Sequence, residues 1–297
     1  DAIIKWLKKK GVEDIIVGEQ SLLGDFIEAA SKSGIAQVCR VNSVPLIEVA
    51  KESFVEKDVD GIKVKVAKIA AERKLINVPV MKTHAQYGIA GALENLIRLL
   101  DMESQKIVHK EGISKILPKL SMLFPSVLTV GDASVAMQNA PLGEPVFMRL
   151  VLASASPLAL DCVFSEISMI PSPNYLKEMD VKDIEIVGEE IDCVKVPLKQ
   201  ARDGSPHPYV RFVGKTCPTC FMGAVSVCRK LIGVGSSGAT IYLAMGDFTK
   251  EMLDGQERVV LYGKDAIENG KKLGVKAVAE LAEEMPELQR TVLLKSL

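Results

Sequence analysis

The chain has 297 residues, of which 48% are hydrophobic and 25% are charged, and this composition is that of a globular protein with one large domain or two smaller ones. Its 37 basic and 38 acidic residues give a formal net charge of −1. This balance excludes the strongly basic class of nucleic-acid-binding proteins and gives no attraction to an anionic membrane. We therefore expect neither nucleic acid nor a membrane among the partners.

No targeting segment is visible in the sequence. No apolar run reaches the roughly 18 residues that a membrane-spanning helix needs, and no secretory signal peptide is seen. The six cysteines do not form the dense framework of a small secreted domain, so we expect a cytoplasmic protein. Residues 1–11 show an amphipathic helix pattern already under way, which predicts a further strand upstream.

Helix-like and strand-like segments alternate along the chain. Ser21 and Gly34 are typical of the two ends of a helix, and Pro157 suits the first turn of another. The alternation favours an α/β fold with a mostly parallel sheet and helices on both faces. The pattern predicts strands at 14–18, 36–41, 63–69, 74–80, 126–133, 149–156, 240–246 and 258–263, and helices at 21–34, 89–100 and 157–170.

A change of composition divides the chain near residues 200–216. This stretch contains two prolines, two glycines and several basic residues, which is typical of a loop or a domain joint. We therefore predict a main α/β domain at 1–205 and a smaller C-terminal α/β subdomain at 206–297.

A lysine and a histidine follow the predicted strand at 74–80. If the chain is still extended there, Lys82 and His84 point to the same side, because side chains alternate along a strand. Gly88 and Gly91 then open the predicted helix, where free N–H groups and the helix dipole favour an anion. These groups predict an anion site beyond the carboxyl end of a strand. The alternative is a surface lysine and a loop histidine.

Three further side chains are candidates for the same site. Asp132 ends the apolar run 126–131 and either faces a pocket or caps a turn. Asp161 lies in a helix that is apolar all round, so its carboxylate needs a partner. It is either a metal ligand or acid–base group, or a structural group that binds loop N–H groups. His109 follows the helix in a charged stretch and, by itself, is typical of a surface residue.

The C-terminal third contains the pair Cys217 and Cys220 at the start of a predicted helix. Thiols at a helix start have a lowered pKa and favour metal or redox chemistry. Cys228 is eight residues further on, about 12 Å away along a continuous helix, and cannot share one ion with the pair. No second pair completes a four-cysteine site, so ordinary thiols remain an alternative.

Several motifs in order resemble the family described as domain of unknown function 362. They are VPVMKTHAQYGIAGALENLI, SVLTVGDASVAMQNAPLGEP and LASASPLALDCVFSEI. The resemblance implies an uncharacterised α/β protein associated with iron–sulfur clusters. Asp265 stands where a further cluster cysteine would fall, so an intact four-cysteine site is not evident. The family positions are Lys82, His84, Asn95, His109, Asp132, Pro141, Gly143 and Asp161.

Three functions remain open from the sequence. In the first, Lys82, His84, Asp132 and Asp161 form a ligand-binding or catalytic site for a small anion or a divalent metal. Ligand-binding positions would then be Gly88, Gly91, Asn95, His109 and Gly143. In the second, Cys217 and Cys220 serve a redox or iron–sulfur accessory protein that meets a redox partner. In the third, the chain is a non-enzymatic scaffold.

Overall fold

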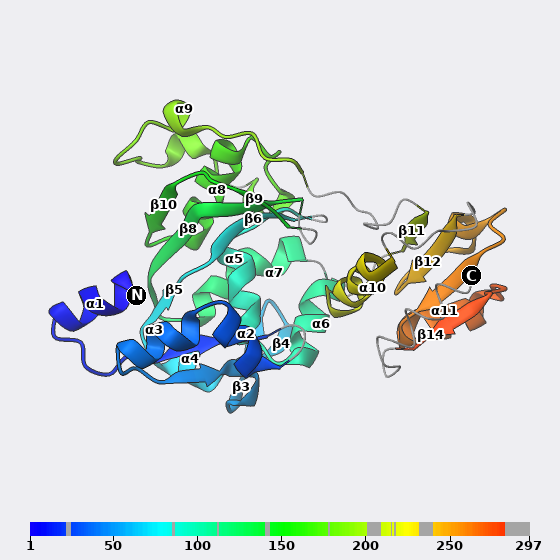
Figure 1. Ribbon diagram of the computed structural model, residues 1–297, viewed down its shortest axis with the longest axis horizontal. Helices are drawn as coiled ribbons and strands as arrows, with labels where there is room; N and C mark the ends of the chain where they lie inside the picture. The colour runs from blue at the N-terminus through cyan, green and yellow to red at the C-terminus, as the bar shows by residue number, and fades with distance from the viewer. Residues whose placement is uncertain are drawn as a thin grey trace. The chain divides into compact units, whose positions relative to one another are not determined.

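A computed structural model describes ten stretches of the chain (Figure 1), and within them the fold is α/β. The chain forms two compact units, and the first comprises Asp1–Lys82, Ile89–Ala136 and Phe147–Pro197. The second comprises Thr83–Gly88, Met137–Val146 and Leu198–Leu297. The predicted boundary at 205/206 lies outside the described residues. The described residues are 1–21, 25–84, 87–111, 113–139, 143–177, 179–200, 209–214, 216, 218–231 and 240–282.

The first unit begins with three helices and a two-stranded parallel sheet. The segment predicted as a strand at 36–41 is a helix, so that prediction is wrong. Cys39 is buried and packs with Ile35 and Val38, which is helical spacing, and Gly34 provides the left-handed φ of 79° before the helix. The elements are α1 (Ala2–Lys9), β1 (Val17–Glu19), α2 (Phe26–Lys32), α3 (Ile35–Val41) and β2 (Leu46–Glu48).

An antiparallel hairpin follows. Its strands β3 (Phe54–Val59) and β4 (Ile62–Ala67) are joined by Asp60 and Gly61, which both have positive φ values of 53° and 80°. Two such residues are typical of a tight hairpin turn. Strand β4 confirms the strand predicted from residue 63, although it ends at Ala67, where α4 (Lys68–Glu72) begins.

The six-stranded main sheet is mixed rather than purely parallel. Its order is β10-β8-β6-β7, and β5 and β9 also pair with β8. Strand β5 runs parallel to β8, whereas β10 runs antiparallel to it. The run predicted as one strand at 74–80 is divided at Pro79, which has no N–H to donate. The strands are β5 (Leu75–Asn77), β6 (Val80–His84), β7 (Gly88–Ala90), β8 (Ser126–Gln138), β9 (Glu144–Val146) and β10 (Leu150–Ser154).

Helices α5 and α8 lie against one face of this sheet. A Cβ on Gly131 of β8 would meet Met81 of β6 at 2.9 Å and Leu160 of α8 at 3.0 Å, so these residues share the covered face. Thr129 and Ala133 are also buried there. The remaining elements of this part are α5 (Ala92–Leu96), η2 (Ile97–Leu99), α6 (Met102–Glu111), α7 (Ile113–Leu120), η3 (Ser121–Leu123), α8 (Pro157–Ser168), η4 (Asn174–Leu176), η5 (Val181–Asp183) and α9 (Ile191–Val194), with η1 (Val49–Lys51) before the hairpin.

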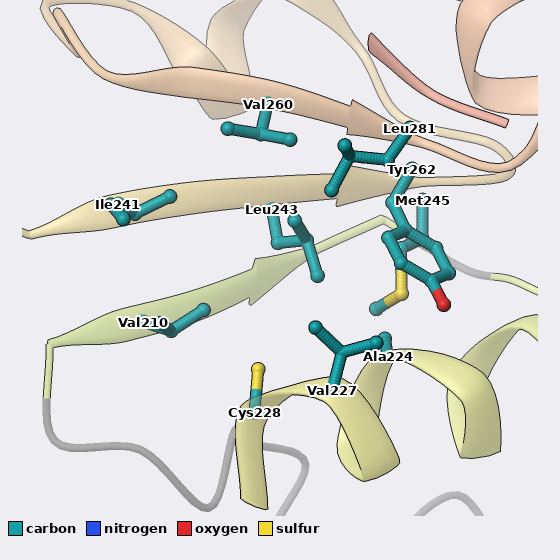
Figure 2. Packing of buried hydrophobic residues seen from close by; sticks show 10 residues of the cluster. All are labelled: Val210, Ala224, Val227, Cys228, Ile241, Leu243, Met245, Val260, Tyr262 and Leu281. Atoms are coloured by element: carbon teal, nitrogen blue, oxygen red, sulfur yellow. The ribbon is translucent and has the colours of Figure 1, made fainter. Parts of the chain in front are cut away.

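The C-terminal sheet of the second unit is parallel throughout, in the order β11-β12-β13-β14. Successive residues of β12 point to opposite faces. Leu243 packs with Ala224 of α10 (Figure 2), and Ala244 packs with Ala266 of α11. Each face of this sheet therefore carries one helix, as predicted for the fold. The elements are β11 (Val210–Val213), α10 (Pro218–Leu231), β12 (Ile241–Met245), η6 (Lys250–Leu253), β13 (Val259–Tyr262), α11 (Lys264–Leu273) and β14 (Ala279–Leu281).

Within the described part of the chain, no helix combines the length and the apolar character needed to cross a bilayer.

Candidate functional site

The carboxylate of Asp161 lies at the start of α5. Helix α8 is buried along most of its length, and Asp161 on it is 0% exposed. Its Oδ1 accepts a hydrogen bond of 2.6 Å from the N–H of Ala92, and its Oδ2 accepts one of 3.0 Å from the N–H of Leu93. The two N–H groups at this helix start therefore bind a carboxylate of the chain itself, and a catalytic or metal-binding role of Asp161 stays a prediction.

Two opposing effects act on the proton affinity of Asp161. Burial raises the pKa of its carboxyl to about 7, and the negative charge of Glu94 adds to the rise, whereas the N–H groups of Leu93 and Ala92 lower it. Burial and the charges of Asp161 and Glu94 also raise the pKa of the Tyr175 hydroxyl well above its usual value. That hydroxyl donates to the carbonyl oxygen of Ile89 at 3.3 Å.

A pair of asparagines fixes α5 from the other side. Asn77 is buried at the end of β5, and its Nδ2 donates to the carbonyl oxygen of Ala92 at 2.8 Å. Its Oδ1 accepts a hydrogen bond of 2.8 Å from Nδ2 of Asn95. The family position Asn95 therefore has a structural partner that the sequence analysis did not select. The sequence signal for this partner was Asn77, a single asparagine within the apolar run 74–80.

Lys82 and His84 leave strand β6 on the same side, as predicted. They are half-buried, whereas the alternating Met81 and Thr83 are fully buried on the covered face. The Nδ1 atom of His84 accepts a hydrogen bond of 3.2 Å from the N–H of Tyr87, and the two rings stack with centroids 4.9 Å apart. In the described part of the chain, Lys82 takes part in no hydrogen bond and no ion pair.

Asp132 lies inside β8 rather than at its end, because the strand continues to Gln138. Its neighbours Gly131 and Ala133 are buried on the covered face, so its exposed side chain lies on the opposite face. There its Oδ1 accepts a hydrogen bond of 2.9 Å from the N–H of Ser134. The structure therefore does not bring Asp132 together with Asp161, since the sheet lies between them.

His109 is inside helix α6 rather than after a helix, and the structure describes its backbone only. Gly88 and Gly143 both have positive φ values, 78° and 67°. Gly91 precedes α5 with a negative φ and lies against Asp161. Pro141 falls outside the described residues. The roles of these positions in ligand binding stay predictions.

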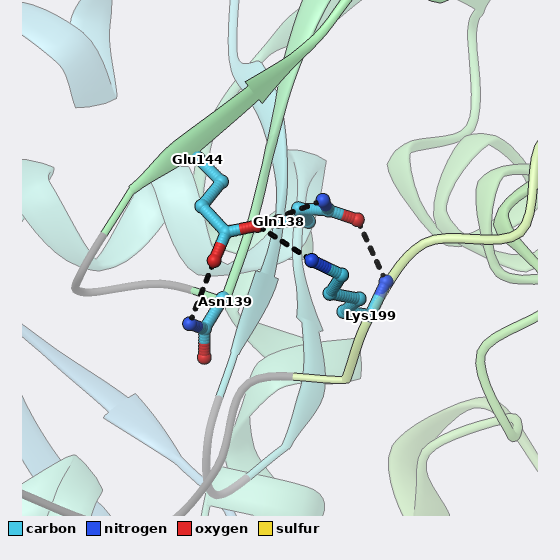
Figure 3. Close-up of polar contacts among 4 residues, drawn as sticks. All are labelled: Gln138, Asn139, Glu144 and Lys199. Atoms are coloured by element: carbon cyan, nitrogen blue, oxygen red, sulfur yellow. Dashed lines mark hydrogen bonds and ion pairs between the residues drawn. The ribbon is translucent and has the colours of Figure 1, made fainter.

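The carboxylate of Glu144 is the centre of a polar cluster beside Gly143 (Figure 3). Glu144 accepts hydrogen bonds from Gln138 at 3.1 Å, Asn139 at 3.3 Å and Lys199 at 3.0 Å. The hydrogen bond from Lys199 is the main cause that lowers the pKa of the Glu144 carboxyl. The Lys199 and Glu144 side chains are 68% and 45% exposed, so this ion pair contributes little to stability.

Both described cysteines of α10 are buried. Cys220 and Cys228 are 6% and 0% exposed, and Cys228 packs among apolar residues of the sheet (Figure 2). Cys217 lies outside the described residues. Among the described residues, no group of three or more His, Cys, Asp or Glu side chains is arranged to hold a metal ion.

Comparison with known proteins identifies a family for this chain. The model of the family described as "Domain of unknown function (DUF362)" matches residues 1–166, which is more than half of the chain. The chain belongs to this family. No curated protein and no solved structure matches. The DUF362 match includes Lys82, His84, Asp132 and Asp161, and it ends before the cysteines of the second unit.

Proposed function

We propose that this DUF362 protein binds a small ligand with a negatively charged oxygen, such as a phosphate or carboxylate group, through Lys82 and His84. The supporting observation is the alternation along β6, which directs a cationic and an imidazole side chain to the same side of one strand. An ammonium group and an N–H donor two residues apart can both contact one such group.

The hydrogen bond of His84 favours an anion over a metal ion. Because Nδ1 accepts from the N–H of Tyr87, the neutral ring carries its proton on Nε2. Nε2 is then a hydrogen-bond donor, and a donor binds oxygen atoms of an anion. A histidine that binds a metal through Nε2 usually donates from Nδ1 instead, which this hydrogen bond opposes.

The charge of Lys82 supports the same ligand class. Its side chain is half-buried, and the described residues provide it with no counter-ion. A partly desolvated cation without a counter-ion is stabilised by a bound anion. Asp161 contributes from the covered face by holding the start of α5, so in this proposal it is a positioning residue and does not contact the ligand.

Calorimetry tests the proposal with inorganic phosphate, sulfate and citrate as probes, and with zinc chloride as a probe for the metal alternative. We expect at least one anion to bind, and Lys82→Ala and His84→Ala each to weaken binding by about tenfold or more. Lys57→Ala is the matched control, because Lys57 is an exposed lysine on β3. Zinc binding that depends on His84, with no anion binding, would contradict the proposal.

The iron–sulfur alternative depends on Cys217, which lies outside the described residues, and the scaffold alternative depends on the absence of any ligand. Neither alternative is supported by an observation as specific as the placement of Lys82 and His84 on the same side of β6. If the chain is a scaffold, Asp161→Asn would lower its melting temperature, and calorimetry would detect no binding of any anion. Acid–base catalysis by Asp132 or Asp161 stays a prediction.

A further inference from the structure

One face of the main sheet is left open by the helices of the first unit. Met81 and Gly131 mark the face covered by α8, and the alternating positions on β6 and β8 point the other way. On that opposite side, Val80 is 51% exposed and Val151 on the neighbouring β10 is 64% exposed. The side chains at these positions form the open face.

The open face is continuous across three strands. Val151 on β10 is directly opposite Asp132 on β8, and Ala153 is opposite Val130. The N–H of Asp132 donates to the carbonyl oxygen of Pro79 at 2.8 Å, which places Asp132 beside the start of β6. Figure 1 shows β8 and β10 side by side. Apolar side chains on the three strands therefore lie around the carboxylate of Asp132.

Both signs of charge occur on this open face. Asp132 is exposed on β8 and Lys82 is half-buried on β6, and neither forms an ion pair within the described residues. A partner of one sign would leave one of these charges unmatched. A two-fold related copy matches both, because in such a contact residue i of one copy meets residue j of the other, and j meets i.

We infer that a second copy of this chain covers the open face, with Val80, Val130, Val151 and Ala153 in the contact and Lys82 of each copy paired with Asp132 of the other. Two sheets packed face to face are a common way to bury apolar sheet faces. Exposed apolar surface of this kind is also typical of association sites.

Sedimentation analysis of the full chain tests the inference, from about 1 to 100 µM protein in a buffer without phosphate or sulfate. We expect a dimer. Val151→Asp should raise the dissociation constant by about 100-fold or more, because the substitution enters a two-fold contact twice. Val41→Asp is the control, since Val41 is 66% exposed at the end of α3. A chain that stays monomeric throughout overturns the inference, as does a dimer that Val151→Asp leaves unchanged.

Charge reversal tests the pairing itself. Asp132→Lys should weaken the dimer by about tenfold, and adding Lys82→Asp should restore most of that loss. No restoration overturns the pairing of Lys82 with Asp132. Anion binding is measured separately by calorimetry on the Val151→Asp variant, which keeps both Lys82 and His84. Because the dimer pairs Lys82 with Asp132, it competes with a bound anion for the same ammonium group, and the monomeric Val151→Asp variant tests the anion site without that competition.

Discussion

Gly91 and Asp161 approach each other so closely that a Cβ on Gly91 would overlap Oδ1 of Asp161 and lie 2.9 Å from its Cγ. The same Cβ would lie 2.9 Å from the terminal methyl carbon of Met81. The backbone angle of Gly91 is φ −125°, so the position requires glycine because of this close approach and not because of a left-handed conformation. The contact joins α8 to the start of α5.

This close approach makes Gly91→Ala strongly destabilising. The new methyl group displaces either the buried carboxylate or Met81, and we expect a loss of about 3 kcal/mol in the free energy of unfolding. Chemical denaturation measures the loss. Gly61→Ala provides the comparison, because its Cβ meets nothing within 4 Å and its cost comes only from a φ of 80°. We expect Gly61→Ala to lower the free energy of unfolding by about 1 kcal/mol. Equal losses in the two variants would show that the contact with Asp161 is unimportant.

Asp161→Asn should also destabilise the chain. The amide can accept the hydrogen bond from one of Ala92 and Leu93, but its NH2 group then faces the other N–H donor. An unsatisfied buried donor costs about 1–3 kcal/mol, and denaturation at pH 8 measures this cost. Asp132→Asn, compared at a protein concentration at which the inferred dimer is dissociated, is the control, because its exposed carboxylate accepts one hydrogen bond from the N–H of Ser134. The expected cost there is about 0.5 kcal/mol. A larger loss of unfolding free energy in Asp132→Asn than in Asp161→Asn would mean that Asp132, and not Asp161, is the carboxylate that stabilises the fold.

The proton affinity of Asp161 predicts a pH dependence with a definite sign. Burial raises the folded-state pKa of its carboxyl to about 7 from an unfolded value of 3.8. The folded state therefore binds the proton more tightly, and this contribution to stability is complete below pH 3.8 and is lost as the pH rises to about 7. The total is of the order of 4 kcal/mol.

The difference between wild type and Asp161→Asn isolates this contribution from the other titrating groups. The free energy of unfolding is measured for both proteins between about pH 4 and pH 8. We expect the wild type to lose stability relative to the variant as the pH rises, with no further relative change above pH 8. The groups facing this carboxyl are Glu94 and Tyr175. A parallel pair of curves would mean that Asp161 keeps one protonation state throughout.

The α/β class and the family were predictable from the sequence because alternating elements and ordered motifs are local patterns. The pairing of Asp161 with α5 was open, because it joins residues about 70 positions apart. The helix α3 was missed because a run of six mainly apolar residues has no clear period, and burial on one side decides its conformation. Similarly, no sequence pattern shows that Asp132 and Asp161 lie on opposite sides of a sheet, because that depends on the register of three strands.

The cysteines of α10 give the last prediction, which concerns iron. Cys228 packs in the apolar cluster of the C-terminal sheet (Figure 2), and Cys220 is buried on the same helix. Helix α11 contains Asp265, the position at which the family resemblance implies a further cluster cysteine. We therefore expect protein purified without oxygen to contain neither iron nor sulfide in stoichiometric amounts. We also expect Cys228→Ala to lower the free energy of unfolding by about 1 kcal/mol through lost packing.

Elemental analysis and the visible absorption spectrum measure the metal content, and denaturation measures the stability. Cys193→Ala is the control variant, because Cys193 is an exposed free thiol on α9, and its stability should stay within about 0.5 kcal/mol of the wild type. Iron and sulfide that are retained in Cys193→Ala but lost in Cys220→Ala would establish a cluster at the Cys217–Cys220 pair. In that case the chain would be an iron–sulfur protein, and the proposed anion site at Lys82 and His84 would be a second site outside the cluster.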